Sequence, residues 1–254
     1  TDAVSSATTV SETPSPAPTE AATEAPEKTP IPDVYEKNLD ALNAPALVQS
    51  VSEQMIDGET YYVVKLVYQG TEITHNIEDF VTITTAPSFY SDLIGQSAAS
   101  LKEGDVIHFT CNLQHRIRKI DLIYRPDFSN YVFSSRDYGT RFSKLLGKDG
   151  YSTYAFGVPV RTGKGYMLLA DINGNTTEVD VSQKAFIYVV SKNARKDKCE
   201  LRGTGAAAIT KTYVQDAGFD NSDNVITWED VDVVSYALAR IVNKTATEVV
   251  VFEY

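Results

Sequence analysis

The sequence predicts an all-β protein with two small antiparallel domains, barrel-like or sandwich-like, in tandem behind a disordered Pro/Thr-rich tail. Three observations support this fold class. Short runs of β-branched and aromatic residues alternate with Gly, Asn and Asp turn signals, a pattern typical of small barrels and sandwiches. The second half of the chain repeats the plan of the first half. Six of the ten prolines fall within the first 32 residues.

The internal repeat links three pairs of segments. The members of the first pair both read as a strand, a glycine-containing turn and a second strand. The paired segments are 66–74 with 169–177, 104–109 with 231–236, and 120–124 with 249–254. We therefore expect two related β domains over 46–126 and 154–254, joined by a connector over 127–153, and each domain is of ordinary size.

The N-terminal region precedes both domains. Residues 1–32 are predicted to be a disordered linker rich in Pro, Thr, Ala and Glu, because they lack the apolar bulk that offsets ordering entropy. Its hydroxyls would suit O-glycans in a secreted protein, and a plain solvated spacer is the simpler alternative. A short helical lead-in is predicted over 33–45, where one apolar stripe ends at Pro45.

The first β domain is predicted from alternating patterns and two turns. Asp57-Gly58 and Gln69-Gly70 indicate hairpins, because these residues tolerate the backbone conformations of tight turns. A brief helix or irregular crossover is expected over 91–101. The predicted strands are 48–55, 61–68, 71–77, 80–84, 106–111 and 118–124.

The second β domain follows the same logic, with Asn173-Gly174 as a hairpin turn. A long irregular stretch is expected over 191–224, and loops of that length usually mark a function or local mobility. The predicted strands are 158–160, 166–172, 176–181, 185–190, 232–241 and 247–254.

Charge and composition exclude several classes of partner. The net charge is −11 and no long basic run is present, which argues against a nucleic-acid groove and against docking on anionic membranes. No apolar stretch is long enough to span a bilayer, so we expect no membrane insertion in this segment. The chain starts at Thr1 rather than Met, which leads us to expect a processed product or a fragment.

The cysteines and histidines are too few for an obvious site. Cys111 and Cys199 are either one bridge in an oxidising compartment or two separate thiols, and the second alternative is favoured. His108, Cys111 and His115 lie in one stretch. However, His108 and Cys111 should point to opposite faces of a strand, so a metal site or a Cys-His nucleophile is disfavoured. His75 is predicted to be partly exposed.

Two groups of residues are candidate binding sites. Carboxylates on a flexible loop suit a surface calcium ion, with an ordinary solvated acidic loop as the alternative; these are Asp216, Asp220 and Asp223. Aromatic rings in and beside the connector suit sugar stacking, with packing between the two domains as the alternative; these are Tyr131, Phe133, Tyr138, Tyr151 and Tyr154. No other cofactor is predicted.

No residue is predicted to be catalytic, since none of the common nucleophile, zinc-protease, phosphate-binding or dinucleotide motifs occurs. Residues 165–175, 179–182 and 248–251 resemble a β module of clostridial-type bacterial cell-surface proteins, often found beside S-layer homology domains. In the first half, 101–107 and 117–123 are similar. The chain lacks the S-layer homology motif itself, so the resemblance carries over no site residue.

The resemblance implies an extracellular location on a bacterial cell surface. We therefore expect a non-catalytic structural or adhesive region of a secreted or cell-surface protein, built of S-layer-like accessory β modules. The expected partners are a cell-wall polymer, a glycan or other copies of the surface protein. A carbohydrate-binding module and a phage or filament structural subunit are the alternatives.

Overall fold

The computed structural model describes residues 44–126, 153–209 and 235–253, apart from six single positions. Those positions are Asp57, Pro87, Ile172, Asn173, Ala194 and Arg195. The predicted linker 1–32, most of the lead-in 33–45 and nearly all of the connector 127–153 lie outside the described residues. All described strands belong to one compact unit, Ile31–Tyr254. Within the described ranges, no helix combines the length and the apolar character needed to cross a membrane.

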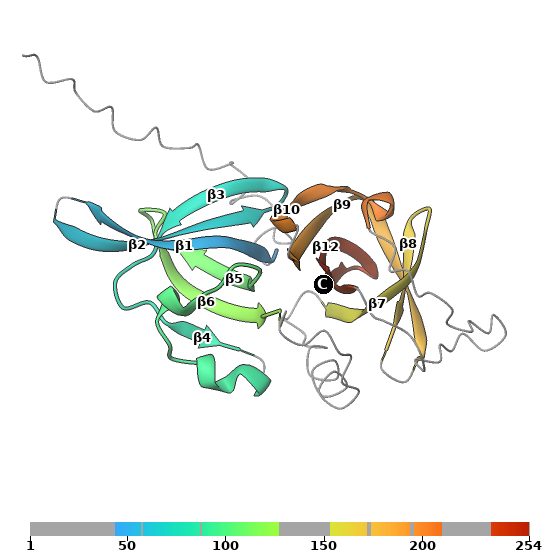
Figure 1. Ribbon diagram of the computed structural model, residues 1–254, viewed down its shortest axis with the longest axis horizontal. Coiled ribbons are helices and arrows are strands. Elements are labelled where there is room, and N and C mark those ends of the chain that lie inside the picture. The colour runs from blue at the N-terminus through green and yellow to red at the C-terminus, as the bar shows by residue number, and fades with distance from the viewer. Residues whose placement is uncertain are drawn as a thin grey trace, which may run out of the picture. The chain divides into compact units, whose positions relative to one another are not determined.

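The first sheet is built from the first six strands in the order β3-β2-β1-β5-β6-β4 (Figure 1). The strands are β1 (Ala46–Ile56), β2 (Glu59–Tyr68), β3 (Thr71–Asn76), β4 (Ile83–Thr85), β5 (Val106–Cys111) and β6 (Ile117–Tyr124). Two short 3-10 helices, η2 (Ser88–Leu93) and η3 (Ala98–Ser100), separate β4 from β5. They occupy the predicted crossover.

The first sheet curls so that the chain just after β3 meets the start of β6. Ile77 and Ile117 form a parallel bridge, and the Glu78 amide donates to the Ile117 carbonyl over 2.8 Å. The strand predicted over 80–84 begins later, at Ile83. The reason is that Phe80 takes a left-handed conformation, with φ 63°, which an extended strand does not accommodate.

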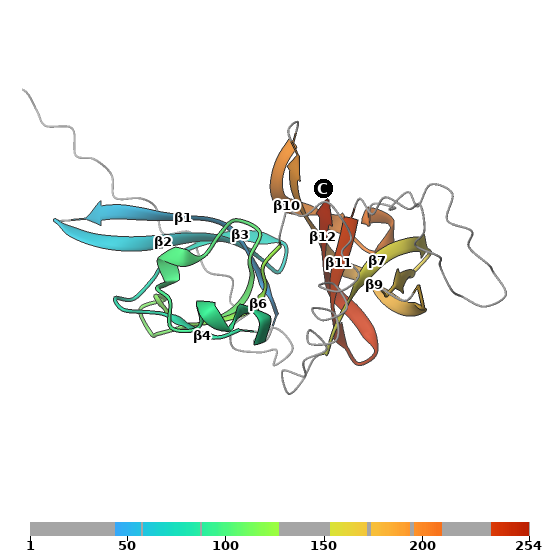
Figure 2. The same ribbon diagram turned by 60° about the horizontal axis from the view of Figure 1, so that its bottom comes forward.

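The second sheet has the order β10-β9-β12-β11-β7-β8, and an additional β9–β8 pairing closes five of its strands into a barrel. The strands are β7 (Thr153–Gly163), β8 (Tyr166–Ala170), β9 (Thr176–Asn193), β10 (Lys196–Thr204), β11 (Ser235–Val242) and β12 (Thr245–Glu253). A further 3-10 helix, η4 (Ala206–Ala208), follows β10. The hairpin formed by the end of β9 and β10 stands out from this barrel (Figure 2).

The two sheets share one connectivity. Each begins with a three-strand meander, β1-β2-β3 or β7-β8-β9, followed by a hairpin, β5-β6 or β11-β12. In each, the first hairpin strand pairs antiparallel with the first meander strand. The last strand meets the third meander strand in parallel. This is the plan of a five-stranded Greek-key barrel of the OB-fold type. The all-β prediction is confirmed, and the repeat segments fall on equivalent strands as far as their residues are described.

Two predictions in the second half are wrong. The strands predicted over 176–181 and 185–190 form one continuous strand, β9. The stretch from 191 was expected to be irregular, yet β9 continues to Asn193 and β10 follows. Charged residues surround the two apolar positions of β10, Cys199 and Leu201. The strand therefore presents one apolar face to the rest of the protein and one charged face to solvent.

Candidate functional site

Each sheet has its own apolar core, and a third cluster is shared by both sheets. We call this third cluster the joint. Its buried members from the first sheet are Leu47, Val67, Val106 and Tyr124. Its buried members from the second sheet are Tyr154, Phe156, Val158, Tyr188, Val190, Cys199, Tyr236, Leu238, Val250 and Phe252. The joint is therefore a continuous apolar contact between the two related sheets.

Aromatic rings lie at the centre of the joint. The Tyr124 ring of the first sheet lies 5.0 Å from the Phe156 ring and 4.8 Å from the Phe252 ring, centroid to centroid. Phe156 in turn stacks on Tyr236 at 5.8 Å, with 14° between the ring planes. Such pairs add about 0.5–1.5 kcal/mol each beyond the burial of their area. One tyrosine of the first sheet is thus held by rings from β7 and β12.

A β-bulge in β1 shapes one edge of the joint. The register of β1 on β2 shifts between Val48 and Ser50, and the intervening Gln49 donates its Nε2 to the Cys199 carbonyl over 2.8 Å. The Cys199 thiol donates to the Val48 carbonyl over 3.2 Å. Cys199 therefore serves as a buried contact between the sheets, and no disulfide joins it to Cys111.

The turn between β2 and β3 forms another edge of the joint. Gly70 donates its amide to the Tyr188 hydroxyl over 3.1 Å. A Cβ on Gly70 would lie 2.5 Å from the Phe186 ring, and its φ is +76°, so glycine is required here for both space and conformation. Burial raises the pKa of Tyr188, so this hydroxyl stays protonated and neutral.

Two further polar groups border the joint. Arg240 and Glu248 face each other across β11 and β12 and form an ion pair of 3.1 Å with side chains only 2% and 6% exposed. The pKa of Tyr68 in the first sheet is raised to about 12, first by burial and then by the Glu248 carboxylate. The Arg240 guanidinium opposes the shift, and the Tyr68 hydroxyl remains neutral.

Tyr154 is the one member of the predicted aromatic patch within the described residues. It is 4% exposed, and its hydroxyl lies 2.8 Å from His108 Nε2 of the first sheet. Tyr154 therefore packs against the first sheet and is not an exposed ring for sugar stacking. Tyr131, Phe133, Tyr138 and Tyr151 lie outside the described residues, and so do Asp216, Asp220 and Asp223 of the predicted calcium loop.

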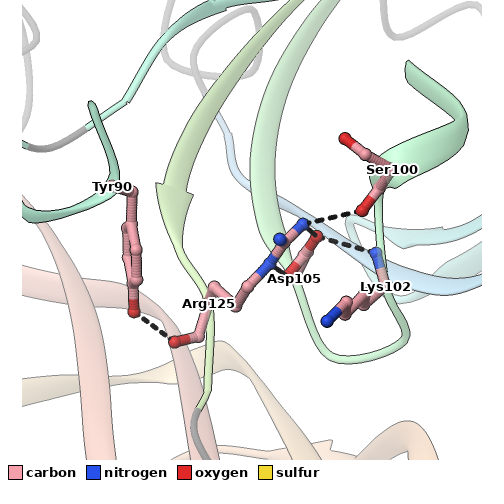
Figure 3. A network of polar contacts seen from close by, with 5 residues as sticks. All are labelled: Tyr90, Ser100, Lys102, Asp105 and Arg125. Atoms are coloured by element: carbon pink, nitrogen blue, oxygen red, sulfur yellow. Dashed lines mark hydrogen bonds and ion pairs between the residues drawn. The ribbon is translucent and has the colours of Figure 1, made fainter. Parts of the chain in front are cut away.

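An ion pair anchors the entry to β5 (Figure 3). Arg125 donates Nε and Nη2 to the two carboxylate oxygens of Asp105, over 2.8 and 2.6 Å. Nη2 also donates to the Ser100 carbonyl, and the Lys102 amide donates to Asp105. The Tyr90 hydroxyl donates to the Arg125 carbonyl. Burial raises the pKa of Asp105, while Arg125 and Lys102 oppose the shift. The segment 101–107, part of the resemblance, thus performs a structural task.

The structure pairs Cys111 with His75 rather than with His108. The His75 Nδ1 lies 2.8 Å from the His115 carbonyl and 3.9 Å from Cys111 Sγ. His75 is 4% exposed, which corrects the predicted partial exposure; its side chain belongs to the inward-facing row of β3. Burial raises the pKa of the Cys111 thiol to about 11 and lowers the pKa of His75.

These pKa shifts oppose nucleophilic chemistry at Cys111 and His75. A thiolate is the reactive form of cysteine, and the Cys111 thiol is protonated near neutral pH. The buried Nε2 of His75 has no hydrogen-bond partner in the structure. Across the described part of the chain, no three His, Cys, Asp or Glu side chains are grouped so as to hold a metal ion.

Sequence patterns do not predict a hollow of ≈ 670 Å³ on the second sheet, which is formed by the β7–β8 turn, the middle of β9 and η4. Its lining residues are Thr162, Gly163, Lys164, Gly165, Val181, Gln183, Thr204, Gly205, Ala206, Ala207 and Ile209. Small residues dominate this lining. Its size is that of a typical small-molecule site.

No family model matches the chain, and no curated protein matches it.

Proposed function

We propose that this chain is a non-catalytic structural or adhesive region of a secreted bacterial cell-surface protein. The observation that carries the proposal is the joint. It makes one body out of two related sheets, through a shared apolar core and hydrogen bonds from both sides. A continuous core of this kind resists bending between the sheets, as a presenting element requires.

The buried ionic groups support the same role. The Asp105–Arg125 pair fixes the entry to β5, and the Arg240–Glu248 pair joins two neighbouring strands. Removing one partner of a buried pair is strongly destabilising, whereas an intact pair adds little net stability. Both pairs therefore specify how strands are held, which suits a scaffold.

The adhesive part of the proposal rests on the surface. Phe80 and Leu113 are 99% and 94% exposed, and they lie on adjoining turns, since Asn112 donates to the Glu78 carboxylate. Exposed large apolar side chains mark interaction surfaces when they gather. Barrels of this plan bind oligosaccharides in other proteins. Cell-wall polymer, glycan or further copies of the surface protein are the proposed partners.

Cosedimentation and analytical ultracentrifugation test the proposal together. The full chain is mixed with purified insoluble bacterial cell wall, and pelleted protein and released reducing sugar are both measured. We expect pelleting that saturates, or reversible self-association in the ultracentrifuge, without release of sugar. A strictly monomeric chain that stays in the supernatant would contradict the proposal, and so would catalytic release of sugar.

A further inference from the structure

The hollow on the second sheet has a distinctive charge. Among the described residues that line it, none carries a carboxylate, and Lys164 is the one charged side chain. The chain as a whole has 34 acidic residues against 23 Lys and Arg. Lys164, with no carboxylate beside it in this lining, offers a cation to an anionic ligand.

The neutral lining groups indicate a hydroxylated ligand. Thr162 and Thr204 offer hydroxyls, and Gln183 offers an amide, so donors and acceptors are both present. Val181, Ala206 and Ile209 belong to the apolar core beneath and form the hollow's apolar floor. A ligand with hydroxyls around its edge and an apolar ring face matches this combination.

The lining also limits how a ligand is held. No aromatic side chain is present among the described lining residues. Without an aromatic ring in the lining, neither a nucleotide base nor a sugar face stacks here, so a ligand has to be held by charge and hydrogen bonds. A sugar acid needs a cation for its carboxylate and hydrogen bonds for its hydroxyls, and both are available.

We propose that this hollow binds a sugar acid, such as a single uronic acid unit at the end of a glycan. Lys164 pairs with the carboxylate, and Thr162, Gln183 and Thr204 bind hydroxyls. The inference deepens the adhesive part of the proposed function by naming the ligand class and the site. It places that site on the β7–β8 turn rather than on the aromatic residues of the connector.

Titration of the ¹⁵N-labelled full chain with sodium D-glucuronate tests the proposal. We expect saturable shifts of the Gly163, Gly165 and Gly205 amides, and much weaker shifts with D-glucose or acetate. Lys164→Gln should weaken glucuronate binding about tenfold or more, as the loss of one charge-assisted contact. Ala207→Trp should abolish binding by filling the hollow, since Ala207 is exposed and its replacement leaves the core intact.

Lys102→Gln is the matched control, because it removes the same charge from an exposed turn of the first sheet and should leave binding unchanged. Absence of glucuronate shifts, equal affinity for acetate, or equal losses in both lysine variants would overturn the inference. These results are separable from the proposed function. Cell-wall cosedimentation that persists in Lys164→Gln would overturn this site while leaving the adhesive role in place.

Discussion

The replacement Gly70→Ala tests the joint with a matched control in the same sheet. Gly70 and Gly58 both lie in hairpin turns with positive φ, +76° and +83°. A Cβ on Gly58 meets nothing within 4 Å, whereas a Cβ on Gly70 lies 2.5 Å from the Phe186 ring of the second sheet. The two replacements therefore share a conformational cost and differ in one contact between the sheets.

The expected magnitudes follow from that difference. Left-handed backbone costs an L-residue about 1–2 kcal/mol, and we expect Gly58→Ala to lower the free energy of unfolding by that amount. Gly70→Ala adds overpacking against Phe186, which costs about 1–3 kcal/mol more. Urea unfolding followed by far-UV circular dichroism measures both variants.

A double-mutant cycle assigns the excess to the contact between the sheets. Phe186→Leu removes the ring atoms that the new methyl group would strike, so the combined variant should recover most of the excess. The same Phe186→Leu change should give no such recovery with Gly58→Ala. If Gly70→Ala and Gly58→Ala cost the same, or if the cycle shows no coupling, the packing of the β2–β3 turn on the second sheet is refuted.

Three further predictions concern the buried polar groups. Asp105→Asn should lower the free energy of unfolding in urea by about 3 kcal/mol, because it leaves Arg125 without its anion. Asp121→Asn, in the exposed pair with Lys119, should lower it by less than about 1 kcal/mol. Equal losses would contradict the structural role of the Asp105–Arg125 pair. Burial lowers the pKa of His75 below its usual 6.5, so the unfolded chain binds the proton more readily and the free energy of unfolding should fall as the pH drops below 6.5. His75→Gln should reduce the slope of the free energy of unfolding against pH between pH 7 and pH 5. An unchanged slope would contradict the burial of His75. Because partial burial raises the pKa of Cys111 to about 11, a thiol reagent at pH 8 should label it much more slowly in the native protein than in the unfolded chain. Equal labelling rates for the two states would contradict its protonated state.

The fold could be predicted from the sequence where side chains alternate strongly. Segments 66–74 and 169–177 were matched by their strand-turn-strand pattern, and both fall on the second and third strands of their sheets. The sequence pattern does not predict β10, because charged residues dominate its composition and only Cys199 and Leu201 face inward. Local composition does not register a strand whose apolar face is that narrow.

The joint could not be predicted because its members are far apart along the chain. Tyr124 is the last residue of β6 and Phe156 lies in β7, and no sequence pattern predicts that their rings are in contact. The sequence placed Tyr154 in an aromatic cluster and left open both sugar stacking and packing. Only the register of β7 beside β11 and the proximity of His108 distinguish the two. The hollow likewise depends on small residues and backbone, which leave no motif.

Hydrogen exchange at increasing urea concentrations measures whether the two sheets unfold together or separately. Amides of β1 and β2 report on the first sheet, and amides of β9 and β12 report on the second. Because the joint couples the two cores, we expect all four strands to lose protection at one common urea midpoint. Two well-separated midpoints, one for each sheet, would contradict the account of a single two-sheet body.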